Sequence, residues 1–255
     1  MLWYKAWLET RWRFLIGLAL LVFSAGGIVI GYPRVMELLP MVPQSDPGSV
    51  LGRAIKEAAE LAATYRGYVW SQWFGQNLPQ AWTVLAVLLG TGGLLTQGAS
   101  GGALFTLSLP LTRGRLLGVR AATALLELFA LALIPSLVLP LMSPAVGQSY
   151  PVVDVVVHAL CLFVGGSVFF SLAFLLSTAF TDVWRPLLIA LCAAFALALI
   201  ERTLRDVAGF GPIRVMTAEA YFRSGGMPWP GLLVSAAASL GMVYAAIKNI
   251  ARQDF

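Results

Sequence analysis

Long apolar stretches dominate this chain, and they restrict its fold more than any other feature. Five of them approach or exceed the roughly 20 residues that a helix needs to cross a hydrocarbon core about 30 Å thick, and a sixth is shorter and bounded by charges. Hydrophobic residues make up 59% of the 255 positions and charged residues 11%, and the mean hydropathy is +0.82. The sequence therefore predicts a membrane protein.

We expect an all-α membrane protein with six transmembrane helices, because lipid cannot satisfy an open strand edge and the ten-residue alternation of a barrel is missing. The expected spans are residues 14–30, 80–96, 122–142, 156–180, 186–200 and 229–247. The fifth is short and must include its flanks or lie in thinner bilayer. The first could also be a cleavable signal peptide, but its apolar run continues past the small residues 24–27, which favours a retained anchor.

The charges predict the orientation, because basic residues are retained on the cytoplasmic side of a membrane. With the loop between spans two and three inside, both termini are cytoplasmic. The inside then holds nine basic residues against Glu9, Asp182 and Asp254, whereas the outside holds eight of each sign. The inside basic residues are Lys5, Arg11, Arg13, Arg113, Arg115, Arg120, Arg185, Lys248 and Arg252. The net charge of +5 is therefore a topology signal and gives no argument for nucleic-acid binding.

Three segments outside the spans have features of their own. Residues 1–13 are aromatic and amphipathic, which predicts a helix in the cytoplasmic interface before the chain turns inward. Residues 31–79 form a long exterior segment with one helix near residues 50–66, either a solvated cap or a gate for substrate. Residues 201–228 are rich in Gly and Pro and predict a structured exterior loop.

The residues needed for most membrane enzymes are missing from the sequence. His158 is the only histidine, so no two-histidine zinc site can form. Ser167 lies nine residues from it in the same expected helix, where the two cannot meet as a catalytic dyad. None of the three lysines closes a phosphate-binding loop, and Cys161 and Cys192 fall within spans, which implies neither a disulfide nor a metal site. We expect no enzyme activity and no cofactor in this chain.

The order of motifs in residues 90–145 resembles the permease subunits of the ABC type-2 transporter family. A span rich in small residues, "VLLGTGGLLTQGASGG", leads to "LSLPLTRGRLL" and then to a long span beginning "VRAATALLELF". The six spans, the N-terminal interfacial helix and the C-terminal "IKNIARQDF" extend the resemblance over almost the whole chain. Where many relatives carry a glutamate soon after span two, this chain has Gln97 and Ser100.

The resemblance implies the membrane subunit of an ATP-driven ABC exporter in a bacterial-type inner (cytoplasmic) membrane. Its partners would be a second permease chain, identical or different, and cytoplasmic ATPase subunits that hold ATP and Mg. Residues 97–121 would be the coupling loop, with Phe105, Leu107, Arg113 and Arg115 at the ATPase, and residues 201–228 would form short exterior or re-entrant helices. Alternatively, the arginines serve topology alone, and the chain is a non-transporting six-span scaffold or assembly factor. The apolar spans favour a lipid-like, peptide or hydrophobic cargo.

Small residues recur at helical spacing in two of the expected spans. They are Ala86, Gly90 and Gly93 in span two and Ala190, Ala194 and Ala198 in span five. Such stripes let helices approach closely. The resemblance implies that these spans line the contact between two permease chains, and the alternative is packing within one chain.

Glu127 is the one ionisable residue deep within an expected span, where an unpaired charge costs roughly 2.5 to 3.5 kcal/mol on insertion scales. Arg120 and Thr123 precede it on the same helix side, so either could partly neutralise or hydrogen-bond it. Glu127 and Arg120 have a structural role or belong to the substrate or coupling path. Pro135 and Pro140 should kink the same helix.

Overall fold

The computed structural model describes residues 2–39, 50–91, 113–180, 182–203, 211–224 and 226–251. Every regular element among them is a helix, as expected. Five are long and apolar enough to cross a membrane: α1 (Leu2–Leu38), α7 (Arg113–Met142, continued by the 3-10 turn η3, Ser143–Val146), α8 (Val152–Ser177), α9 (Trp184–Thr203) and α12 (Trp229–Ala251). This is the architecture of a multi-pass helical membrane protein.

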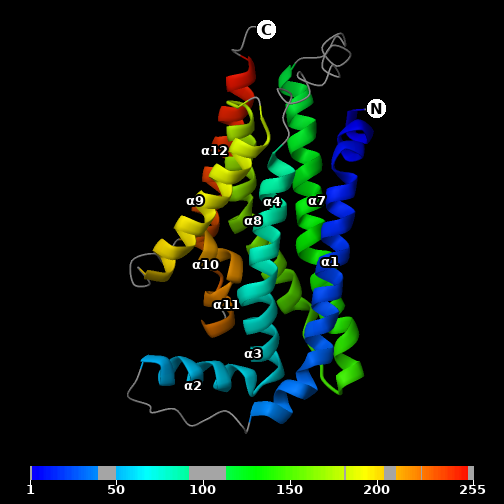
Figure 1. The fold of residues 1–255 in the computed structure, drawn as a ribbon, viewed down its shortest axis with the longest axis vertical. Coiled ribbons are helices and arrows are strands. Elements are labelled where there is room, and N and C mark those ends of the chain that lie inside the picture. The colour runs from blue at the N-terminus through cyan, green and yellow to red at the C-terminus, as the bar shows by residue number, and fades with distance from the viewer. Residues whose placement is uncertain are drawn as a thin grey trace.

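Figure 1 shows the helices as an elongated bundle with both described chain ends at one end of it. We call this the terminal end; it also holds the start of α7 and the end of α4. Helix α2 (Val50–Ala62) lies across the opposite end, which we call the α2 end. A helix is thus present where one was expected near residues 50–66.

Helix α1 is continuous from Leu2, which corrects the prediction that residues 1–13 form a separate helix before a turn. Residues 2–13 contain neither Gly nor Pro, so nothing in the sequence stops the helix there. The buried positions recur every three or four residues, from Ala6 and Thr10 through Phe14 and Gly17. The first three turns therefore pack on the bundle as the rest of α1 does, while Trp3 and Trp12 remain exposed.

The second expected span is not among these five helices, and the helical run that contains its start begins well before residue 80. Helix α3 (Tyr65–Val69), the π-helix η2 (Trp70–Asn77) and α4 (Leu78–Gly90) follow one another without a break. Residues 65–77 were expected in an exterior segment, yet Trp70, Trp73 and Phe74 are buried. Their large aromatic side chains pack into the bundle, although polar residues lie between them.

Helices α4, α7 and α8 form the centre of the bundle, where Trp82 of α4 and Trp73 of η2 both contact α7. The indole N–H of Trp82 donates to the carbonyl oxygen of Leu128 at 3.0 Å, and that of Trp73 donates to the hydroxyl of Ser136 at 3.1 Å. The Trp82 ring lies against Gly166 of α8, where a β-carbon would overlap it. Helix α7 passes through Pro135 and Pro140 without interruption.

The fifth expected span is longer than its apolar core, because α9 includes flanking residues on both sides and reaches 20 residues. Two short helices follow it, α10 (Pro212–Thr217) and α11 (Glu219–Ser224). Helix α10 docks on Gly165, at the middle of α8: a β-carbon there would lie 2.9 Å from the carbonyl oxygen of Pro212. A bulkier residue at position 165 would hold α10 away from α8.

Helix α12 runs parallel to α8 and begins beside its middle. Leu232 packs with Cys161 near the start of α12, the hydroxyl groups of Ser239 and Ser171 lie 2.5 Å apart, and the Asn249 amide donates to the Thr178 hydroxyl at 3.0 Å. The first turns of α8, which precede the start of α12, are instead contacted by Tyr221 of α11.

Candidate functional site

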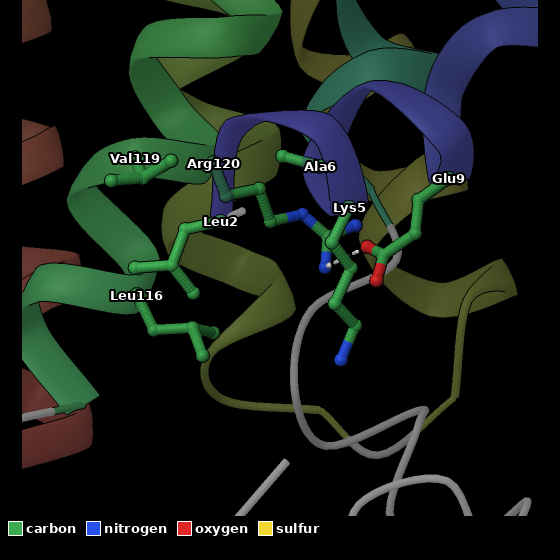
Figure 2. A pocket seen from close by; sticks show the side chains of 7 residues that line it. All are labelled: Leu2, Lys5, Ala6, Glu9, Leu116, Val119 and Arg120. Atoms are coloured by element: carbon green, nitrogen blue, oxygen red, sulfur yellow. Dashed lines mark ion pairs between the residues drawn. The ribbon is translucent and has the colours of Figure 1, made fainter. Parts of the chain in front are cut away.

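The N-terminal turns of α1 and the start of α7 enclose a polar site at the terminal end. A guanidinium nitrogen of Arg120 on α7 lies 3.6 Å from a carboxylate oxygen of Glu9 on α1. Figure 2 shows the two side chains reaching toward each other between the helices, with Lys5 on the same helix as Glu9. The cavity beside them has a volume of about 30 Å³, so it has room for a water molecule but not for an organic ligand.

Glu127 lies on α7 seven residues after Arg120, further from the terminal end, and its side chain is buried, at 4% exposed. The hydroxyl group of Thr10 donates a hydrogen bond to its Oε1 atom. Its Oε2 atom is buried and has no hydrogen-bond partner among the residues that the structure describes. A carboxyl group in this position is costly whether it is charged or neutral, because one oxygen stays unsatisfied in either state.

The predicted neutralisation of Glu127 along its own helix is wrong. Arg120 is paired with Glu9, and the Thr123 hydroxyl donates to the carbonyl oxygen of Val119 at 2.9 Å. Both groups find closer partners than a carboxyl group further along α7. The actual partner, Thr10, is 117 positions away in sequence, so only an expectation that α1 packs on α7 could have found it.

The predicted coupling residues lie at the terminal end or outside the described residues. Phe105 and Leu107 fall in the segment 92–112, of which the structure describes nothing. Helix α7 begins at Arg113, and Arg115 is exposed. A β-carbon at Gly114 would lie 3.4 Å from Ile247, so the start of α7 adjoins the end of α12. Contact of these arginines with an ATPase stays a prediction.

The predicted dimer-contact residues are largely covered by the chain's own helices. Ala86, Ala190 and Ala194 are buried, and Ala198 is partly exposed. Gly90 lies against α8, where a β-carbon would be 2.7 Å from the carbonyl oxygen of Phe170. Gly93 lies outside the described residues. Packing within one chain is thus what the structure has at Ala86 and Gly90, and a contact between two chains stays a prediction.

His158 is fully buried. Its Nδ1 atom lies 2.7 Å from the carbonyl oxygen of Asp154, and its ring packs on Phe74 at a centroid distance of 4.3 Å. Ser167 bonds to its own helix at Val164. Within the described ranges no group of three or more His, Cys, Asp or Glu side chains could hold a metal ion.

A second polar network, which no sequence pattern predicted, lies toward the α2 end. The carboxylate of Asp154 accepts hydrogen bonds from Arg66 at 2.8 Å and from the Tyr221 hydroxyl at 3.0 Å. Arg223 pairs with Glu57 of α2 and with Glu219, each at 2.8 Å. Hydrogen bonding to Glu57, with Glu219 adding to it, raises the pKa of Arg223 above its ordinary value. These pairs join α2, α3, α8 and α11.

Comparisons with known proteins identified no relative: no protein-family description, no curated protein and no solved structure matched the chain.

Proposed function

We propose that this chain is the membrane subunit of an ATP-driven ABC exporter, with six spans and both termini in the cytoplasm. The observation that carries the proposal is the place of the segment that resembles ABC type-2 permeases. Helix α7, which begins within that segment at Arg113, starts at the terminal end beside the last turns of α12. A coupling loop needs this position to meet a cytoplasmic ATPase.

The span that completes the six is second in chain order and consists of the continuous run of α3, η2 and α4. Its 26 residues, 65–90, correspond to about 39 Å at 1.5 Å per residue, enough to cross a bilayer core. Arg66 in its first turn is the only charged residue in the run. Its central turns are of the wider π type, so no single α-helix within it has membrane-spanning length.

The distribution of charge supports the orientation. The described basic residues that the sequence assigned to the cytoplasm belong to the start of α1, the start of α7, the start of α9 and the end of α12. These four helix ends gather at the terminal end (Figure 1). Acidic and basic residues are mixed near α2, where Glu57, Glu60 and Lys56 lie together. An excess of basic residues on one side marks the cytoplasmic side of a bacterial-type inner membrane.

Helices α10 and α11 support the short exterior or re-entrant helices that the resemblance implies. Pro212 contacts the middle of α8 at Gly165, and Tyr221 reaches Asp154 in the first turn of α8. Helix α10 thus begins beside the end of α9 at Glu201, α11 lies nearer the α2 end, and the chain then leads into α12. With six spans, the α2 end faces the exterior.

ATP and Mg would bind in separate ATPase subunits, and a second permease chain would complete the translocation path. The resemblance supplies these partners and the outward direction of transport. Glu127 and Arg120 lie where α1 meets the helix that follows the coupling loop, so a movement of that loop would reach both side chains through α7.

Copurification of this chain, expressed with its genomic neighbours, tests the proposal. The wild-type protein should retain the ATPase in mild detergent, and Arg113→Glu/Arg115→Glu should lose association or ATPase stimulation, because acidic side chains reverse the charge of the coupling contact. Arg202→Glu is the matched control, since Arg202 is also exposed but belongs to the far end of α9. A wild-type protein that purifies without any nucleotide-binding subunit would contradict the proposal and favour the scaffold.

A further inference from the structure

Four carboxamide side chains follow one side of the helical run formed by η2 and α4. All four are exposed, and they are Gln72, Gln76, Asn77 and Gln80. The residues between them face the bundle, where Trp73 and Leu78 are fully buried. We call the four exposed side chains the carboxamide face. Nothing in the proposed contact with an ATPase uses this face.

Two contacts with α1 fix the level of the carboxamide face in the bundle. The Tyr68 hydroxyl donates to the carbonyl oxygen of Ile28 at 3.1 Å. Further along the run, the side chain of Leu85 lies 2.8 Å from the position that a β-carbon of Gly17 would take. The carboxamide face belongs to the part of the run between Tyr68 and Leu85. It is therefore level with the part of α1 between Ile28 and Gly17, where the two helical segments run side by side (Figure 1).

That part of α1 is the middle of a stretch without charge. The stretch runs from Phe14 to Pro33 between Arg13 and Arg34, and its length of about 30 Å equals the thickness of a hydrocarbon core. Phe23, near its centre, is 80% exposed, as a side chain that faces lipid should be. In a membrane that α1 crosses, the carboxamide face therefore lies near the middle of the hydrocarbon core.

Hydrocarbon cannot satisfy the hydrogen-bonding groups of this face. The Asn77 amide donates to the backbone carbonyl oxygen of Gln72 at 2.7 Å. The side chains of the three glutamines have no hydrogen-bond partner in the part of the chain that the structure describes. Lipid headgroups would be about 15 Å away, further than a glutamine side chain reaches. Because an unpaired amide in hydrocarbon is costly, something polar must cover the face.

The chemistry of the face favours water and a neutral solute over a closely packed helix. Contacts between membrane helices are enriched in small residues, which let the backbones approach. The small residues Ala86 and Gly90 of this run are buried in the chain's own bundle, whereas the face itself consists of longer amide side chains. Each carboxamide offers a donor and an acceptor without a charge, which suits hydroxyl and amide groups. The π turns of η2 agree with such a role, since π turns occur frequently at functional sites.

We propose that the carboxamide face borders a water-filled path at the middle of the membrane and receives uncharged solutes that carry hydroxyl or amide groups. Water and solute would form hydrogen bonds with the amide side chains in place of the missing protein partners. The assignment of this solute as the cargo rests on the proposed export function, whereas the contact of the face with water does not depend on an ATPase. A wholly hydrophobic cargo would make no use of this face.

Thiol labelling in membranes tests the inference. Gln76→Cys and Phe23→Cys are introduced one at a time into a chain in which Cys161 and Cys192 are replaced by alanine. Both positions are exposed and level with each other, but only position 76 belongs to the carboxamide face. An uncharged hydroxyethyl maleimide should label Gln76→Cys at least tenfold faster than Phe23→Cys, because the reactive thiolate forms in water and not in lipid. Labelling after denaturation controls for the amount of each protein.

Two labelling results would overturn the inference. Equally slow labelling at both positions would show that lipid covers the carboxamide face. A disulfide between two copies of Gln76→Cys after mild oxidation would show that the face packs on a second chain and not on water. Neither result depends on an ATPase: fast labelling at position 76 without copurification of an ATPase would contradict the exporter and leave the hydrated face in place.

A buried charge gives a second readout that needs no cysteine. Gln76→Glu should accumulate in the membrane at the wild-type level, because water in the path can solvate the carboxylate. Phe23→Glu places the same charge against lipid at the same level and should reduce the accumulated protein severalfold. Quantitative immunoblotting of membranes measures both variants. An equal loss of the two proteins would overturn the proposal.

Discussion

At the scale of single residues, buried polar groups depend on partners from distant parts of the chain. Glu127 is satisfied on one side by Thr10, and Arg120 by Glu9, both from α1. The sequence showed that Glu127 needs a partner but not which helix supplies it. The pairing follows from the packing of α1 on α7, which a pattern along one helix does not contain.

Thr10→Val should destabilise the protein by about 1–3 kcal/mol, because it leaves the buried Glu127 carboxyl without its only described donor. In the Glu127→Gln background the same change should cost less, since a neutral amide is less costly to leave unpaired than a carboxylate. Unfolding in detergent measures both differences. Thr203→Val is the control, because Thr203 is exposed. An equal cost in both backgrounds would show that Thr10 does not stabilise the carboxyl group.

Glu127→Gln also bears on whether this residue has more than a structural role. If Glu127 belongs to the coupling or substrate path, the variant should assemble and reduce ATP-driven transport, because the amide keeps the shape of the side chain but removes its proton-dependent charge. Transport in proteoliposomes that contain the ATPase measures the effect. Unchanged transport and assembly would leave Glu127 a structural residue.

Gly166→Ala should destabilise the bundle by about 1–3 kcal/mol, because the added β-carbon overlaps the ring of Trp82, which is fully buried. Gly27→Ala is a matched control: Gly27 is also in a helix, and a β-carbon there meets nothing within 4 Å. That control should be neutral or slightly stabilising, since Ala favours the helix. Thermal unfolding of the two variants compares them, and a similar melting temperature for both would contradict the packing described at Trp82.

At the scale of elements, the sequence predicted which segments are helical but not all of their limits. The apolar cores of α7, α8, α9 and α12 were recognisable because each is continuous. The packing of residues 65–77 on the bundle was not predicted, because Ser71, Gln72 and Gln76 interrupt the apolar pattern, while the buried aromatic residues between them hold η2 in the bundle. The interfacial helix at residues 1–13 was misassigned because exposed aromatic residues at Trp3 and Trp12 conceal a buried stripe.

The junction of α9 and α10 depends on Glu201, whose carboxylate accepts the backbone N–H groups of Ile213 and Arg214 at 3.2 and 3.0 Å. Glu201→Ala should therefore increase amide hydrogen exchange at these two residues by about tenfold, corresponding to the loss of roughly 1–1.5 kcal/mol of capping. Arg202→Ala, at the exposed neighbouring position, should not. Hydrogen exchange at α10, followed by mass spectrometry, measures the effect. Equal protection in both variants would exclude Glu201 as the cap.

At the scale of the whole molecule, six spans require the terminal end and the α2 end to face opposite sides of the membrane. In a background with Cys161 and Cys192 replaced by alanine, a cysteine at Glu60 should react with an impermeant maleimide in intact cells. A cysteine at Lys248 should react only after permeabilisation, because the proposed orientation puts the end of α12 on the cytoplasmic side. Gel-shift labelling measures both. Equal reactivity at the two positions would show that α3, η2 and α4 do not complete a sixth span.

The central claim is that the start of α7 meets a cytoplasmic ATPase, and photocrosslinking in living cells tests it most directly. A photoreactive residue in place of Arg115, which is exposed at the terminal end, should capture the nucleotide-binding subunit. The same residue in place of Lys56 on α2 should not. An adduct from position 115 that contains this subunit is the predicted result. The account is contradicted if position 115 yields no such adduct while the ATPase is present in the cell.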